Sequence, residues 1–100
     1  MKKKILIVVA SYYESIANSL LKSAKNKIKN KCNIEVIKVP GAFEIPVTIA
    51  KNLKKFNGFI ALGCVIKGQT PHFDFISKST TDALMTLSIM SKKPIGNGVI

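Results

Sequence analysis

Residues 58–74 read GFIALGCVIKGQTPHFD. The apolar run at 58–65 is typical of a short buried strand, and the polar, glycine-containing segment after it carries the chain's only histidine, His72. Apolar positions then recur at helical spacing, with Asp74 or Ser77 as the predicted N-cap. Because ligands bind beyond the carboxyl ends of strands in alternating α/β chains, residues 63–74 are the predicted centre of a functional site.

The same alternation extends outward in both directions. A continuous apolar run at 5–10 (ILIVVA) predicts a strand buried on both faces, and a helix is expected over 16–28. A strand nearer an edge is expected at 34–39 and a helix at 47–53. A last strand is expected at 95–100. The pattern β-α-β-α-β-α-β predicts a four-stranded parallel sheet with right-handed crossovers and helices on both faces.

Length and composition narrow the class of protein. One hundred residues with 47% hydrophobic content predict a single domain, residues 1–100. No apolar run approaches the roughly 18 residues of a transmembrane helix, and none resembles a signal peptide, so a cytoplasmic protein is expected. Cys32 and Cys64 stand outside metal-binding spacings and are expected to be reduced thiols without a metal.

The net charge of +11 comes from sixteen lysines without any arginine. Arginine is the side chain that recognises bases and phosphates most often, and the lysines are scattered over every polar segment. We therefore expect solvated helix faces and no nucleic-acid partner. Binding to RNA remains an alternative that would show as a steep loss of affinity with salt.

Four loops are expected along the carboxyl edge of the sheet: 11–14, 41–44, 67–72 and, as a further candidate, 96–97. Together they offer aromatic rings, free backbone amides, one carboxylate and an imidazole.

These groups suit a ligand with three chemically different parts. A planar heterocycle would stack on Tyr12 or Tyr13, and a polyol would bond the backbone amides and Glu44. A phosphate would lie at the helix start near Gln69 and Thr70.

Three stretches carry a family resemblance: VPGAFEIP at 39–46, ALGCVIKGQTPHFDF at 61–75 and PIGNGVI at 94–100. They resemble the signature stretches of the 6,7-dimethyl-8-ribityllumazine synthases of riboflavin biosynthesis. The resemblance implies a flavodoxin-like three-layer α/β/α sandwich, assembled as pentamers or icosahedral shells of pentamers with active sites between subunits. It also implies a transferase that condenses 5-amino-6-(D-ribitylamino)uracil with 3,4-dihydroxy-2-butanone 4-phosphate, releasing phosphate and water without metal or organic cofactor.

The resemblance also implies roles for individual residues. His72 matches the histidine that transfers protons, the only catalytic residue expected here. Eight residues match the aminouracil site: Tyr12, Ala42, Phe43, Glu44, Cys64, Val65, Ile66 and Asn97. Three match the site of the butanone phosphate: Lys67, Gln69 and Thr70. Asn97 matches a position that reaches the pyrimidine site of a neighbouring subunit.

The chain also departs from the family pattern. Tyr13 stands where many members have Asn, Gln69 where Glu or Ala is common, and Asn97 where Phe is common. Family members are longer, and their C-terminal part carries the last two helices and an arginine that holds the phosphate. The chain is therefore interpreted as a C-terminally truncated member, and the alternatives are an inactive fragment or a non-catalytic protein for ligand binding and assembly. A change at His72 would distinguish catalysis from binding.

Overall fold

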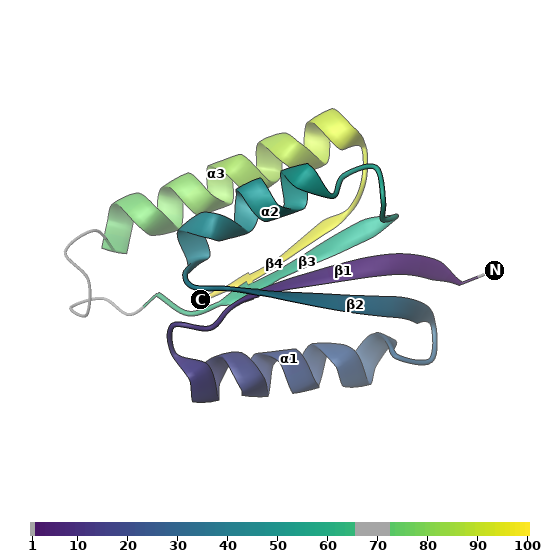
Figure 1. The fold of residues 1–100 in the computed structure, drawn as a ribbon. Helices are drawn as coiled ribbons and strands as arrows, with labels where there is room; N and C mark the ends of the chain where they lie inside the picture. The colour runs from purple at the N-terminus through teal and green to yellow at the C-terminus, as the bar shows by residue number, and fades with distance from the viewer. Residues whose placement is uncertain (1, 66–72) are drawn as a thin grey trace.

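In the computed structural model, which describes residues 2–65 and 73–100 apart from the side chains of residues 73 and 74, the strands form one parallel sheet. Its strand order is β2-β1-β3-β4 (Figure 1). The elements of the described part are β1 (Lys3–Ala10), α1 (Glu14–Ile28), β2 (Cys32–Val39), the 3₁₀ helix η1 (Ala42–Glu44), α2 (Ile45–Lys51), β3 (Gly58–Gly63), α3 (Phe73–Ser91) and β4 (Ile95–Val99). The predicted alternation of strands and helices is thus confirmed over the described residues.

Strand β1 lies inside the sheet, as its continuous apolar run predicts. It pairs with β2 on one side and with β3 on the other, and every residue from Leu6 to Ala10 is buried. Because successive side chains of a strand point to opposite faces, Leu6 and Val8 enter one core cluster while Ile7 and Val9 enter another. The strand therefore supplies apolar side chains to both faces of the sheet.

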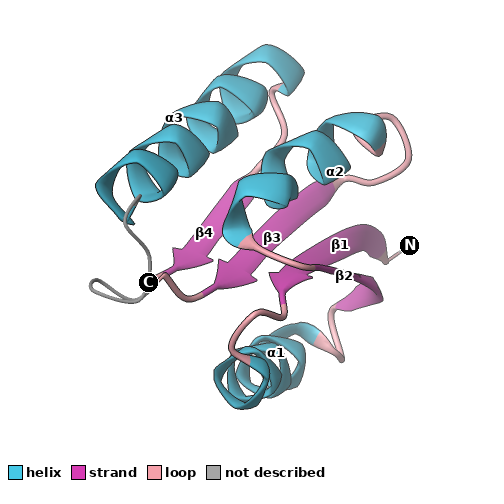
Figure 2. Cartoon of the chain, turned by 60° about the vertical axis from the view of Figure 1, so that its left-hand side comes forward, coloured by secondary structure: helices cyan, strands magenta, loops and turns pink. Residues whose placement is uncertain are grey.

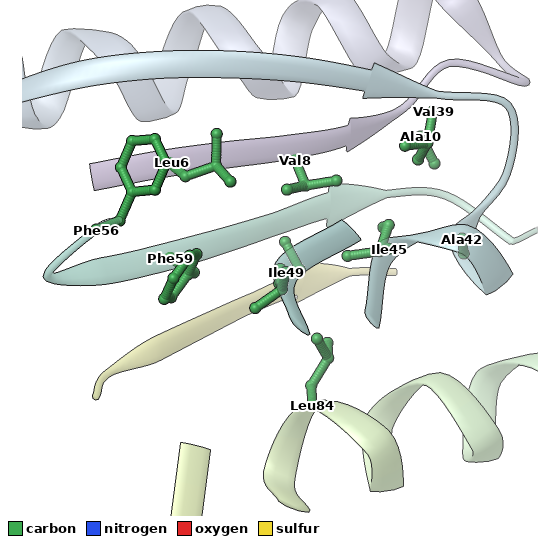
Figure 3. Packing of buried hydrophobic residues seen from close by; sticks show 11 residues of the cluster. Leu6, Val8, Ala10, Val39, Ala42, Ile45, Ile49, Phe56, Phe59 and Leu84 are labelled. Carbon is green, nitrogen blue, oxygen red and sulfur yellow. The ribbon is translucent and has the colours of Figure 1, made fainter. Parts of the chain in front are cut away.

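Helices α2 and α3 cover one face (Figure 2). Pro46 lies in the first turn of α2, where its missing N–H costs no helical hydrogen bond. Ile45 and Ile49, one helical turn apart, are fully buried and join Phe59 and Leu84 in the core on this face (Figure 3). This packing fixes the start of α2, and with it the η1 turn, against the sheet.

Helix α1 lies on the opposite face, where Ala17 is buried against Ile7, Val9 and Leu62 (Figure 2). The connection from β1 to β2 runs through α1 on this face and leads towards one edge of the sheet. The connection from β2 to β3 runs through α2 on the other face and leads in the opposite direction across the sheet. Reversing both the direction and the face keeps the hand of the crossover, so these crossovers share one hand, as expected of parallel sheets.

Two predicted boundaries were wrong near the edge of the sheet. Residues 42–44 were expected as a loop, but they form the 3₁₀ helix η1, since Pro46 presets helical backbone directly after them. Strand β3 ends at Gly63, so Cys64 and Val65 lie just beyond it.

Two further predictions fail at α3 and β4. Asp74 and Ser77 lie inside α3, so neither is its N-cap. Residues 96–97 lie inside β4 rather than in a loop at the carboxyl edge, because Gly96 and Asn97 pair with Ile60 and Ala61 of β3. Among the helices that the structure describes, none combines the length and the apolar character that a membrane span requires.

Candidate active site

The carboxyl ends of β1, β2 and β3 lie at one edge of the sheet. Ala10 pairs with Val39, and Val9 pairs with Leu62 next to the last residue of β3. Beyond the strand end, the Ser11 N–H donates to the Val39 carbonyl at 2.9 Å, and the Ser11 hydroxyl donates to the same oxygen at 3.2 Å. The loop after β1 is thereby tied to the end of β2.

Tyr12 presents an aromatic ring at this edge. Its side chain is 74% exposed, although its ring centroid lies 4.9 Å from that of Tyr13 in an edge-to-face arrangement. Tyr13 is half-buried, and burial together with the neighbouring Tyr12 and Cys64 raises the pKa of its hydroxyl above its ordinary value. Tyr13 thus packs against the ring of Tyr12, and most of the surface of the Tyr12 side chain stays accessible.

The η1 turn follows β2 at the same edge and is held by a set of short contacts. The Gly41 N–H donates to Glu44 Oε1 at 2.8 Å, and the Glu44 N–H donates back to the Gly41 carbonyl at 3.2 Å. The Thr48 hydroxyl donates to the Glu44 carbonyl at 3.0 Å, and Ala42 is buried in the core. Glu44 therefore has a structural role as a cap of its own turn, whatever it contacts in a ligand.

Phe43 lies outside the core. It is 55% exposed, and its ring centroid lies 6.2 Å from that of Phe75 on α3, with the two planes tilted by 33°. Phe75 is 62% exposed. An aromatic pair therefore lies on the surface where η1 meets α3.

Cys64 and Val65 follow β3 at the same edge, and both are half-buried. The Val65 N–H donates to the Ile100 carbonyl at 2.7 Å, and the Ile100 N–H donates to the Gly63 carbonyl at 3.0 Å. The Val65 side chain packs against the core under α2 and α3. These contacts continue the pairing of β3 with β4 past the strand ends and hold residues 64 and 65 in place.

Asn97 lies apart from these residues. It sits two positions before the end of β4, opposite Ala61, and its Oδ1 accepts a hydrogen bond from the Val99 N–H at 3.0 Å. It lines a groove of about 210 Å³ between α3 and β4. The other residues that line the groove are Thr81, Leu84, Met85, Ser88 and Ile95. Within one chain, Asn97 therefore does not join the loops at the carboxyl edge.

The remaining predicted site residues lie outside the described part of the chain: Ile66, Lys67, Gln69, Thr70 and His72. Among the described residues, the structure brings together Tyr12, the η1 turn and residues 64–65 at one edge. Phe75 is the neighbour of this edge that the sequence did not single out. No signal in the sequence marks Phe75, because single apolar side chains are common on exposed helix positions and its contact with Phe43 joins distant segments.

The order and direction of the strands, with helices on both faces and loops gathered at the carboxyl edge, define a flavodoxin-like α/β domain, a class whose ligands bind beyond that edge. Comparison with known proteins gives the particular family: the sequence model for 6,7-dimethyl-8-ribityllumazine synthase matches residues 2–100. The chain belongs to this family.

Curated relatives agree with the family match. The chain is 42% identical to the 6,7-dimethyl-8-ribityllumazine synthase of Bartonella tribocorum over 106 residues, which cover 100% of the chain and 70% of that protein. It is 41% identical to the enzyme of the same name from Methylobacterium nodulans, covering 97% of the chain and 58% of the relative. It is 42% identical to that of Agrobacterium fabrum, covering 99% and 72%. The chain thus spans between 58% and 72% of the length of these relatives.

Proposed function

We propose that this chain forms 6,7-dimethyl-8-ribityllumazine from 5-amino-6-(D-ribitylamino)uracil and 3,4-dihydroxy-2-butanone 4-phosphate, releasing phosphate and water. The observation that carries the proposal is the family match over residues 2–100, in a chain whose Tyr12, η1 turn and residues 64–65 meet at one sheet edge. The relatives at about 40% identity are named for the same product.

The aminouracil would bind at the described part of the edge. The exposed ring of Tyr12 offers a stacking surface for the pyrimidine, and the backbone carbonyls of Cys64 and Val65 after β3 offer acceptors to the ring edge. The backbone groups of η1 and the carboxylate of Glu44 would meet the hydroxyls of the ribityl chain. The Gly41 contact occupies Oε1 of Glu44 and leaves the other lone pairs of the carboxylate for such a bond.

The butanone phosphate would bind through Lys67, Gln69 and Thr70, and His72 would transfer protons. The amine of the aminouracil attacks the ketone carbon, and the carbinolamine then loses water and phosphate before the second ring closes. A group that titrates near neutral pH suits these proton transfers, and His72 is the only histidine in the sequence. Holding two reactants side by side supplies much of the remaining acceleration.

The proposal includes an assembled, cytoplasmic enzyme without metal or organic cofactor. The exposed apolar side chains of Met85, Ile89 and Met90 on α3 support an oligomer, because contact between subunits would remove them from water. Pentamers, alone or in an icosahedral shell, are the assembly that the family resemblance suggests.

The test is to mix the purified chain with both substrates and to follow the fluorescence of the lumazine above the uncatalysed background. The His72→Ala variant is the matched control, since it removes the proposed proton-transfer group and leaves the described edge unchanged. Product formation by the wild type that falls towards background in the variant supports the proposal. A wild-type rate equal to background contradicts it.

A second candidate is ligand binding without turnover at the same edge. One feature of the sequence favours it: all sixteen basic residues are lysines, and arginine is the side chain that holds a phosphate in a bidentate manner. In that case the chain binds the lumazine with the same affinity before and after the change at His72, and neither protein shows turnover.

A further inference from the structure

The surface contact between η1 and α3 has no role in the proposed reaction. Phe43 belongs to the turn that is proposed to hold the ribityl chain, whereas Phe75 belongs to a different element, 32 positions later in the sequence. Their ring centroids are 6.2 Å apart and their planes are tilted by 33°. This separation lies within the range of 4.5–7 Å in which aromatic pairs attract one another.

The neighbours of each ring explain why the contact matters. Phe43 lies between Ala42, which is buried in the core, and Glu44, whose carboxylate binds the Gly41 N–H. Its own ring points outward and is 55% exposed. Without a partner, such a ring would exchange rotamers freely on the surface. Phe75 is its aromatic neighbour among the described residues.

Helix α3 gives Phe75 a rigid base. The next residue, Ile76, packs against the core, and Thr80 and Leu84 follow at intervals of four residues and are buried. Phe75 itself lies on the exposed flank of this anchored helix, with 62% of its side chain accessible. It can therefore restrain Phe43 while adding little to the core.

We propose that Phe75 is a positioning residue that acts through the ring of Phe43 to hold the η1 turn in the conformation that binds the ribityl chain. Phe75 does not touch the reacting atoms. This inference rests on the proposed function, because it assigns Phe75 a part in the binding of the aminouracil and of the lumazine. It predicts an effect on affinity that requires both rings.

The experiment is a double-mutant cycle on the affinity of the full chain for 6,7-dimethyl-8-ribityllumazine, measured by the fluorescence of that compound. Phe75→Ala is expected to weaken binding roughly twofold to tenfold, the range that corresponds to one aromatic pair. In the Phe43→Ala background the same change is expected to alter the affinity by less than about 1.5-fold. Phe75→Tyr keeps the ring and should bind as the wild type does.

Kinetics and a control variant separate positioning from general damage. Phe75→Ala should raise the KM for the aminouracil and change kcat by less than about twofold, since the ring is not present at the reacting atoms. Lys78→Ala, on the same helix and 79% exposed, should leave both constants unchanged.

Three results would overturn the inference. The first is an unchanged affinity in Phe75→Ala, and the second is an equal loss with and without the Phe43 ring. The third is a wild-type chain that neither binds the lumazine nor forms it, which refutes the proposed function as well. A wild type that binds normally while the cycle shows no coupling refutes the positioning role alone.

Discussion

Thr80 offers a direct test of how the core on the α2 and α3 face is packed. Its side chain is 1% exposed, and among the described residues its Oγ1 has no hydrogen-bond partner. Two other threonines in these helices differ: the hydroxyl of Thr86 donates to the Asp82 carbonyl at 3.0 Å, and that of Thr48 donates to the Glu44 carbonyl at 3.0 Å. We therefore expect the hydroxyl of Thr80 to destabilise the folded chain.

The change Thr80→Val replaces this hydroxyl with a methyl group of similar size. A buried, unpaired polar group costs about 1–3 kcal/mol, and Val and Thr have nearly equal helix propensities. The free energy of unfolding should therefore rise by about 1 kcal/mol or more, and each kcal/mol should raise Tm by roughly 4–8 °C in a chain of this size. Urea unfolding measures the change, which should appear as a higher midpoint with an unchanged slope.

Two matched variants complete the test. Thr48→Val removes a hydroxyl that has a partner and should lower the free energy of unfolding by about 0.5–1.5 kcal/mol. Thr86→Val lies on the exposed face of α3 and should stay within about 0.5 kcal/mol of the wild type. A loss of stability in Thr80→Val as large as that in Thr48→Val would refute the reasoning, because it would mean that the buried hydroxyl is bonded in solution.

Three other variants probe the core, the η1 turn and the edge aromatics. Ile49→Ala removes a fully buried side chain and should lower the free energy of unfolding in urea by about 2–5 kcal/mol; a loss below 1 kcal/mol would contradict the packing under α2. Glu44→Ala removes the acceptor of the Gly41 N–H and should cost about 0.5–2 kcal/mol and weaken lumazine binding, whereas Glu44→Gln keeps an acceptor oxygen and should retain most of both. Because the pKa of Tyr13 is raised in the folded chain, its hydroxyl ionises first in the unfolded chain as the pH rises above about 10, and the free energy of unfolding falls there. Between neutral pH and this range, Tyr13→Phe should lose less free energy of unfolding than Tyr12→Phe. Equal losses in the two variants would exclude the shift.

The aromatic residues show where reasoning from sequence reached its limit in the site. Tyr12 was expected to present its ring, and it does so at 74% exposure. Phe43 was expected at the aminouracil site from the family resemblance, because one apolar residue in a short turn has no periodicity to assign the direction of its side chain. The pair of Phe43 with Phe75 joins residues 32 positions apart, a contact that depends on how α3 crosses the η1 turn.

Asn97 shows a second limit. Residues 95–100 were expected as a strand, and residues 95–99 do pair with β3 as a regular strand. Residues 96–97 were also a candidate for a loop at the carboxyl edge, which is wrong because both residues pair inside the sheet. The position of Asn97 in a groove beside α3 follows from that pairing.

Local sequence was enough for the order of the elements, the central place of β1 and the edge that carries the loops. Apolar runs, helical spacing and turn residues act over a few neighbouring positions, and the hand of parallel crossovers leaves few ways to arrange them. Tertiary packing decided where β3 ends, which rings meet on the surface and that the hydroxyl of Thr80 lies in the core. These features depend on contacts between segments far apart in the chain, and such contacts exist only once the sheet and its helices have come together.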